Sequence, residues 1–154
     1  VSCAYPVNAD LRERIAKSIE KTSVKFTSGG SYVCIEGPQF STRAESEIYR
    51  SFHADVIGMT NVPEAFLAKE AGMAYATIAM VTDFDCWKEE HCTVEEIMKV
   101  MGDNYKSAQD IIVELIPSLV QNPVTFEPEN KFAVVTKPEL IGTETQTIID
   151  TLLS

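Results

Sequence analysis

The sequence predicts an α/β fold in which helices pack around a mixed or largely parallel central sheet. Short apolar runs, typical of buried strands, alternate along the chain with segments whose apolar residues recur at helical spacing. Capping boxes of the form Thr-x-x-Glu and a helix-ending glycine separate these segments. Such alternation is typical of a sandwich with a sheet between helical layers. In folds of this kind, ligands bind at the carboxyl ends of the strands.

The first half of the chain contains five predicted elements. Asn8 is a suitable N-cap for the first helix, and Thr42 and Glu45 form a capping box at the start of the second. Asn61 begins the third helix, and Gly72 ends it as the residue after the C-cap. The predicted elements are a helix at 8–21, a strand at 29–37, a helix at 42–51, a strand at 54–59 and a helix at 61–72.

The second half begins with the pattern of a buried strand. Residues 73–81, MAYATIAMV, are almost uninterruptedly apolar, which predicts a strand buried on both faces. Thr93 and Glu96 form a capping box for a long helix, which we expect to end near Ile116 because Pro117 follows. The remaining predicted elements are a strand at 131–136 and a short helix that starts with the pattern Thr143-x-x-Gln146.

Composition limits the class of protein. The chain has 154 residues, of which 45% are hydrophobic, enough for one globular domain with a core. Its net charge of −10 argues against a general binder of nucleic acid or anionic membranes. The sequence shows no apolar run of about 18 residues and no signal-peptide pattern, so we expect a cytoplasmic protein without a transmembrane helix.

The cysteines do not indicate a disulfide framework or a metal site. Cys3, Cys34, Cys86 and Cys92 match no spacing of small secreted proteins, so we expect reduced thiols. Cys86, His91 and Cys92 form a C-x4-H-C pattern, which lacks the C-x2-C pairing usual in zinc sites. We therefore expect no metal.

Two of the predicted strand ends lead into helix starts. After the first, Phe40 and Ser41 precede the capping box. An aromatic there either packs on its own helix as a hydrophobic staple or forms one wall of a ligand site, and local chemistry favours the staple. After the second, Met59 and Thr60 precede a helix N-terminus, where a hydroxyl and free amides can bind phosphate. Simple capping by Thr60 or Asn61 is favoured when this pattern is taken alone.

A pair of carboxylates follows the 73–81 run. Asp83 and Asp85 flank Phe84, and at this spacing they point the same way if strand geometry continues. Close carboxylates at the mouth of an apolar pocket can retain a proton, donate a hydrogen bond or act as a general acid. The alternative is an Asx-type turn with Asp85 exposed. The spacing leaves both interpretations open.

Long collinear blocks of the chain resemble a known enzyme family. The blocks are EGPQFSTRAES, ADVIGMTNVPEAFLAKEAGMAYATIAMVTDFDCW and the helix after them, and they extend from about Gly30 to Pro117. They resemble the 5′-methylthioadenosine phosphorylases, which belong to the trimeric branch of the purine nucleoside phosphorylase family. The resemblance implies a three-layer α/β sandwich around a mixed sheet. Residues 1–117 would be the C-terminal portion of the phosphorylase domain, and residues 118–154 an extension of the same domain with a short strand and helix.

The resemblance also implies an activity. Such enzymes convert methylthioadenosine and inorganic phosphate, their co-substrate, into adenine and 5-methylthioribose 1-phosphate, and they need no further cofactor. They are homotrimers. The chain opens VSCAYPV, without methionine, and lacks the family's glycine-rich phosphate loop. We therefore expect a partial chain that needs an upstream fragment and is inactive alone. The alternatives are a phosphorylase for methylthioinosine, adenosine or inosine, and a non-catalytic nucleoside-binding fragment.

Individual roles follow from the family's motifs. Asp83 and Asp85 would be the catalytic groups at the purine, with Asp83 nearest N7 and the exocyclic amine, and Thr60 would be one of several phosphate ligands. Relatives acting on 6-oxopurines carry Asn in place of Asp83 and Glu in place of Ser41, so this chain is expected to prefer a 6-aminopurine. The substrate contacts implied by the family are Phe40 against the nucleoside, Ser41 facing the base, Met59 at the ribose, Thr82 at the purine, and Val94 and Ile97 at the methylthio pocket.

Overall fold

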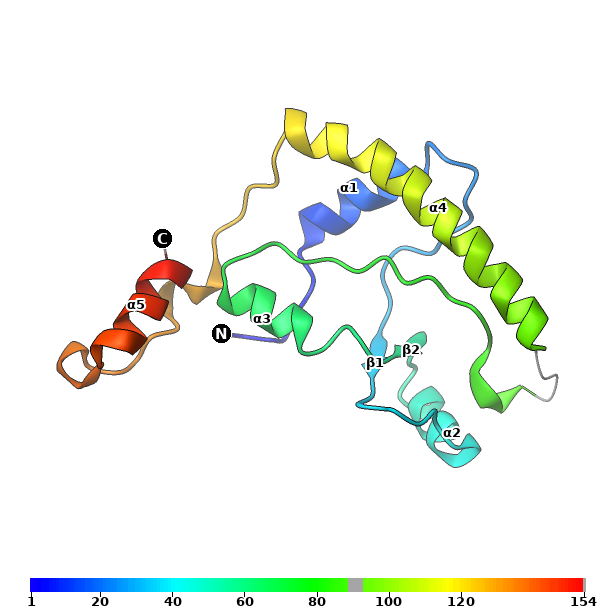
Figure 1. Ribbon diagram of the computed structural model, residues 1–154, viewed down its shortest axis with the longest axis horizontal. Helices are drawn as coiled ribbons and strands as arrows, with labels where there is room; N and C mark the ends of the chain where they lie inside the picture. The colour runs from blue at the N-terminus through cyan, green and yellow to red at the C-terminus, as the bar shows by residue number, and fades with distance from the viewer. Residues whose placement is uncertain (89–92, 154) are drawn as a thin grey trace.

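The computed structural model describes residues 1–88 and 93–153 and contains helices and a small parallel sheet. One pair of helices, α1 and α4, packs together, and the strands lie below this pair with α2 and α3 (Figure 1). The elements in chain order are α1 (Ala9–Ile19), β1 (Tyr32–Cys34), α2 (Arg43–Ser51), β2 (Val56–Gly58), α3 (Glu64–Glu70), the 3₁₀ turn η1 (Asp85–Trp87), α4 (Val94–Gln121), the 3₁₀ turns η2 (Glu129–Phe132) and η3 (Pro138–Leu140), and α5 (Thr143–Leu152).

The two strands pair in parallel. Tyr32 lies opposite Val56 and Cys34 opposite Gly58, so both strands end at the same edge of the sheet. Asp55 fixes the beginning of the pair, because its carboxylate accepts hydrogen bonds from the Ser31 backbone amide at 2.7 Å and from the Ser31 hydroxyl at 3.1 Å. The predicted strands at 29–37 and 54–59 are therefore confirmed, each shorter than the sequence pattern.

The hydrophobic core lies between α1 and α4. Ile15 and Ile19 of α1 meet Ile111 and Leu115 of α4, and all four side chains are buried. Their spacing of four residues on each helix places them on one face. Partly buried side chains complete the cluster from α1, α4 and two other segments, namely Leu11, Val24, Ala76, Ile78 and Leu119.

The helix starts largely follow the predicted capping chemistry. Asn8 caps α1 by accepting from the Leu11 amide, and complete capping boxes begin α2 and α4. Gly72 follows the C-cap of α3 with a φ of +66°, a left-handed conformation that favours glycine. Two cap predictions are wrong. The N-cap of α3 is Pro63, and that of α5 is Gly142, and neither makes a side-chain cap hydrogen bond.

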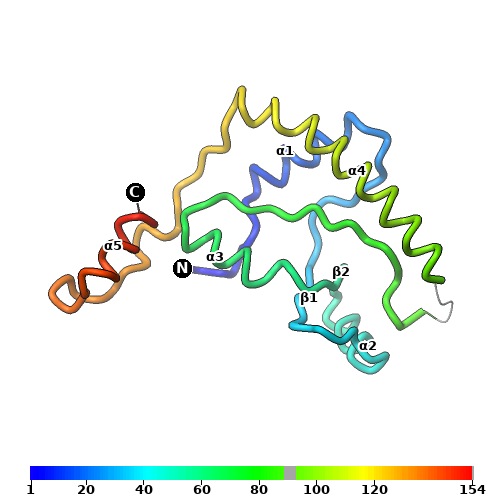
Figure 2. Tube along the Cα trace, viewed as in Figure 1, coloured from blue at the N-terminus to red at the C-terminus, as the bar shows by residue number. Residues whose placement is uncertain are grey.

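The apolar run 73–81 is not a strand within the described chain. The segment is irregular and crosses the molecule from the end of α3 toward η1 (Figure 2). Met73, Met80 and Val81 are more than half exposed, while Ala76 and Ile78 contact the α1–α4 core. A strand requires a neighbour for its backbone groups, and the sheet among the described residues contains only β1 and β2. The predicted two-sided burial is therefore absent here.

Two further predictions about the second half are wrong. Residues 131–136 form no strand, because η2 occupies Glu129–Phe132 and the side-chain amide of Asn130 donates instead to the carbonyls of Glu70 and Leu152. Pro117 does not end the long helix, which continues to Gln121. Proline removes one amide donor from a helix, and the added turn brings Leu119 against the core.

The C-terminal extension lies at the opposite end of the molecule from α2 (Figure 1). Lys69 of α3 forms an ion pair with Glu129, so η2 is held against the end of α3. No helix in the described part of the chain is both long enough and apolar enough to cross a membrane.

We predict that core truncation on α4 depends on which face is altered. Ile111→Ala should lower the free energy of unfolding by about 2–4 kcal/mol, because Ile111 is 3% exposed and loses its contacts with α1. Ile112→Ala is the matched control, since Ile112 is 45% exposed and its truncation should cost less than about 1 kcal/mol. Urea unfolding of the two variants measures both values. Equal losses would contradict the assignment of the core.

We predict a pH-dependent contribution from the capping box of α2. The Thr42 amide and hydroxyl donate to Glu45, and these bonds hold the pKa of Glu45 below its ordinary value of 4.5. Since the folded state binds the proton less readily than the unfolded state, this stabilisation is fully present above about pH 4.5 and is lost as pH falls through the lowered pKa. The difference in free energy of unfolding between wild type and Glu45→Gln should therefore shrink as pH falls from about 5 to about 2. Urea titrations at several pH values across this range measure it.

The control for this prediction is Glu144→Gln. Glu144 lies in the first turn of α5, which has no side-chain cap, so the substitution removes a comparable charge without opening a capping box. A wild-type advantage over Glu45→Gln that stays constant across this pH range would contradict the prediction.

Candidate functional site

The structure brings two of the predicted site segments together. The 3₁₀ turn η1 packs against α2, although about forty residues separate them in sequence. The Cys86 thiol donates to the Ser41 carbonyl oxygen at 3.4 Å. At the other end of α2, the Arg50 guanidinium lies 4.1 Å from the centroid of the Trp87 ring. The turn η1, which ends the polar stretch at 82–87, is therefore held against α2 and the Ser41 backbone.

The α2 start presents an aromatic side chain and a free hydroxyl. The Thr42–Glu45 capping box fixes the backbone of the turn. Phe40 is 86% exposed, so it does not pack on α2 as a hydrophobic staple. The Ser41 hydroxyl is buried and has no hydrogen-bond partner among the described residues. A buried hydroxyl without a partner is uncommon, so this oxygen has its full hydrogen-bonding capacity available to a ligand.

Asp83 forms a local turn. Its carboxylate accepts from the Thr82 hydroxyl at 2.6 Å and from the Asp85 amide at 3.3 Å. This is the Asx-type turn that the sequence left open, but the expectation that Asp85 is exposed is wrong, since Asp83 is exposed and Asp85 is partly buried. Strand geometry does not continue through the pair, because Asp85 has a φ of +56° and begins η1. The expectation that the two carboxylates point the same way along a strand is therefore wrong.

The ends of β1 and β2 are fixed against each other. The Cys34 thiol accepts from the Val62 amide at 3.3 Å, which joins β1 to the turn after β2. The sulfur of Met59 lies close to Gly37, and a Cβ at Gly37 would be 2.7 Å from it. Gly37 also has a φ of +72°, so a side chain here would be both strained and obstructed. Met59 thus packs at the end of β1, and the exposed Thr60 follows it.

The remaining predicted contacts lie at the start of α4. Val94 is 71% exposed and Ile97 is partly buried, and the helix that carries them packs against α1. One hydrogen bond connects α4 to the site region, from the Asn104 amide to the Val81 carbonyl at 3.0 Å. Residues 89–92, which join η1 to α4, lie outside the described residues. Val94 and Ile97 stay predictions.

Three residues that connect the site elements were not singled out from sequence, and a fourth was considered only as part of a metal pattern. Arg50, Trp87 and Asn104 are the three, Cys86 is the fourth, and all connect elements that are far apart in the chain. Spacing within a motif carries no signal for such contacts. Only the single tryptophan, placed directly after a candidate site motif, offered a clue.

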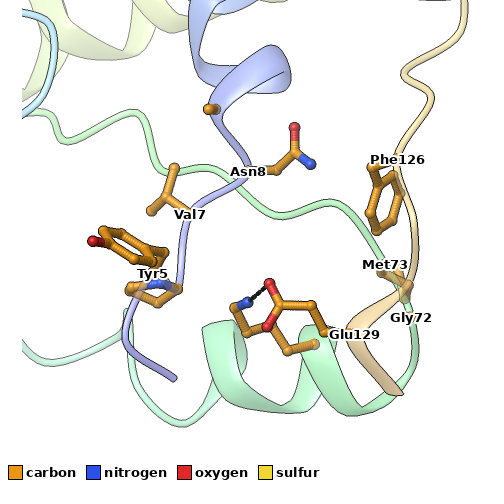
Figure 3. Close-up of a pocket in the computed structure, with 10 residues that line it drawn as sticks. Tyr5, Val7, Asn8, Gly72, Met73, Phe126 and Glu129 are labelled. Carbon is orange, nitrogen blue, oxygen red and sulfur yellow. Dashed lines mark hydrogen bonds and ion pairs between the residues drawn. The ribbon is translucent and has the colours of Figure 1, made fainter. Parts of the chain in front are cut away.

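Two cavities lie away from these residues. One of about 160 Å³ opens between the N-terminal segment and the end of α3, beside the ion pair of Lys69 with Glu129 (Figure 3). The other, of about 470 Å³, lies between the end of α1 and α4. Neither is lined by a predicted site residue. The first cavity is lined by Tyr5, Pro6, Val7, Asn8, Ala9, Lys69, Gly72, Met73, Phe126 and Glu129.

A metal centre finds no support in the described part of the chain. No group of three or more His, Cys, Asp or Glu side chains there could hold an ion. Two members of the C-x4-H-C pattern, His91 and Cys92, lie outside the described residues.

Comparison with known proteins connects this geometry to a family. The family model described as "Phosphorylase superfamily" matches residues 1–117. The chain is 48% identical to S-methyl-5′-thioadenosine phosphorylase of Thermofilum pendens, over 77% of this chain and 45% of that protein. It is 43% identical to the enzyme of the same name from Bradyrhizobium diazoefficiens, over 90% of this chain and 50% of that protein. The chain thus spans about half the length of the curated relatives it matches.

Solved structures agree. The crystal structure of a methylthioadenosine phosphorylase from an antarctic soil metagenomic library aligns with all of this chain and 56% of its own, with a TM-score of 0.89 and 37% identity. Methylthioadenosine phosphorylase from Schistosoma mansoni in complex with adenine aligns with 79% of this chain and 48% of its own, with a TM-score of 0.68 and 33% identity. The predicted mixed α/β fold is confirmed, with only part of its sheet present. By both sequence and structure, the chain belongs to the phosphorylase superfamily.

Proposed function

We propose that this chain carries the nucleoside-recognising part of a 5′-methylthioadenosine phosphorylase. The reaction converts methylthioadenosine and inorganic phosphate into adenine and 5-methylthioribose 1-phosphate. The observation that supports the proposal is the packing of η1, which directly follows the Asp83 turn, on α2 through the hydrogen bond from Cys86 to the Ser41 carbonyl. The Ser41 hydroxyl is buried there without a partner among the described residues. Relatives named S-methyl-5′-thioadenosine phosphorylase, and a related structure that holds adenine, support the same assignment.

The side chains around the base favour a 6-aminopurine. An ionised Asp83 can accept from a 6-amino group, and a protonated Asp83 can donate to N7. A keto oxygen at position 6 would instead face a carboxylate acceptor, and an unmatched polar pair can cost several orders of magnitude in rate. Ser41 supplies a hydroxyl that can donate or accept. Phe40, exposed in the chain, would form the wall against which the nucleoside packs.

The mechanism that these groups support is dissociative. As the glycosidic bond lengthens, the ribosyl ring gains oxocarbenium character and the purine gains negative charge. Asp83 relieves that charge by a hydrogen bond or a proton at N7, and phosphate attacks the anomeric carbon from the opposite face. Asp85 lies next to this group and supports the turn through its amide. Met59 would contact the ribose, Thr60 the phosphate, Thr82 the purine, and Val94 and Ile97 the methylthio group.

The active form is proposed to be an assembly. The chain spans about half of its relatives, and the apolar segment 73–81 has no strand neighbour among the described residues. We propose that an upstream polypeptide of the same enzyme supplies the missing strands and most phosphate ligands, and that the whole forms a homotrimer in the cytoplasm, where it serves purine and methionine salvage. Phosphate is its co-substrate, and no other cofactor takes part. Residues 118–154 are an extension of the same domain.

The phosphate dependence of adenine release tests this function. The chain, together with the upstream polypeptide that completes the enzyme, is incubated with methylthioadenosine with and without inorganic phosphate. We expect adenine only when phosphate is present, because phosphate is the nucleophile. Release without phosphate would indicate a hydrolase. Binding without any release would indicate the second candidate, a nucleoside-binding module, which the partial span of the chain favours.

We predict that Asp83→Asn changes the choice of base. An amide cannot protonate N7, but its NH₂ can donate to a 6-keto oxygen, so the ratio of kcat/KM for 6-oxopurine nucleosides over methylthioadenosine should rise by about tenfold or more. Asp83→Ala is the control, since it removes the carboxylate without adding a donor. That variant should lose turnover while its phosphate affinity changes little. An unchanged substrate ratio in Asp83→Asn would refute the assigned role.

A further inference from the structure

We propose that Arg50 and Trp87 act as positioning residues that hold the Asp83 turn in register with the Phe40–Ser41 turn. The inference rests on the proposed function, since it assigns the two turns to one substrate. It adds a role for a helix end and an aromatic side chain that contact neither reacting group.

The contact is a stacked cation and ring. The guanidinium carbon of Arg50 lies 4.1 Å from the centroid of the Trp87 ring, within the range of a cation–π interaction. Glu47, one helical turn earlier on α2, forms an ion pair with Arg50 at 3.5 Å. This pair orients the guanidinium, because the planar group is held on one side by the carboxylate and on one face by the ring.

The aromatic contact continues toward the base-facing turn. Phe84, which directly follows Asp83, meets Trp87 edge to face with ring centroids 6.1 Å apart. The ammonium of Lys88 lies 4.3 Å from the centroid of the Phe84 ring. Contacts therefore continue from the Arg50 guanidinium at the end of α2, through the paired rings of Trp87 and Phe84, to the residue next to Asp83.

A second contact joins η1 to the start of α2. At the start of α2, the Cys86 thiol donates to the Ser41 carbonyl at 3.4 Å. The turn η1 is thus fixed to α2 at both ends of the helix, by Cys86 and by Trp87. Two attachment points fix the direction in which η1 lies along α2, which the thiol contact at Ser41 alone would not fix. The direction in which Asp83 faces then depends on Arg50.

This role predicts a selective kinetic effect. In the assembled enzyme, Arg50→Gln should raise the KM for methylthioadenosine roughly two- to fivefold, the range expected for loss of an exposed cation–π contact. The KM for phosphate should not change, because the proposed phosphate contact, Thr60, follows β2 and not η1. Arg50→Lys, which keeps the charge but not the planar stack, should fall between wild type and Arg50→Gln.

A spectroscopic readout tests the contact without any activity. Trp87 is the single tryptophan of the chain, so its emission reports on this site alone. Removing the guanidinium from one face of the ring should increase acrylamide quenching in Arg50→Gln and accelerate amide exchange at Asp85. Arg12→Gln is the matched control, because Arg12 is an exposed arginine on α1. Arg12→Gln should leave the acrylamide quenching, the amide exchange at Asp85 and both KM values unchanged.

The outcomes separate the two proposals. Unchanged quenching and exchange in Arg50→Gln would overturn the positioning role, as would a fall in kcat with both KM values constant, which indicates fewer folded molecules. An equal rise in both KM values would also overturn it. A wild-type assembly that releases no adenine would refute the proposed function, and quenching with amide exchange would still decide whether Arg50 fixes the turn.

Discussion

The parallel pairing of β1 with β2 is the constraint on which the site depends. Parallel strands end at one edge, so the pairing places the segments after Cys34 and after Gly58 side by side. The bonds from Ser31 to Asp55 set the register at the beginning, and the Cys34–Val62 contact holds the ends together. From this edge, α2 starts at a defined place and direction. The turn η1 then packs on α2, so the position of Asp83 ultimately derives from the register of two three-residue strands.

The shortness of the sheet explains why the apolar segment 73–81 is partly exposed. The 73–81 run has the composition of a strand buried on both faces, yet its backbone meets no sheet partner in the described chain. One side of it contacts the α1–α4 core through Ala76 and Ile78, while Met80 and Val81 remain exposed. The composition of this run thus suits a strand inside a larger sheet, whereas the two-stranded sheet of the described chain gives it no strand to pair with. That contrast agrees with a chain that spans about half of its relatives.

Sequence reasoning succeeded where the deciding interaction is local. The boxes at Thr42 and Thr93 and the cap at Asn8 join residues three positions apart, and the structure confirms all three. It failed where a distant partner decides. Asn61 was predicted to cap α3, but its buried side chain accepts from the hydroxyls of Tyr75 and Thr77 instead. The stack of Arg50 on Trp87 joins residues 37 positions apart in sequence, a distance over which no spacing rule operates.

Local structure and ligand recognition are compatible at both turns. The Asx turn occupies Asp83 with one hydrogen bond to each carboxylate oxygen, and each oxygen has lone-pair capacity for one more. The turn therefore orients the Asp83 carboxylate and leaves each of its oxygens able to accept a further hydrogen bond. In the stretch at 40–46, Thr42 and Glu45 bond to each other, while the Ser41 hydroxyl has no partner among the described residues and Phe40 is exposed. The capping box thus accounts for the backbone of the turn and not for the two side chains before it. A ligand that packs on Phe40 and bonds to the Ser41 hydroxyl would satisfy both, and η1, which follows Asp83 in the chain, is joined to Ser41 through Cys86.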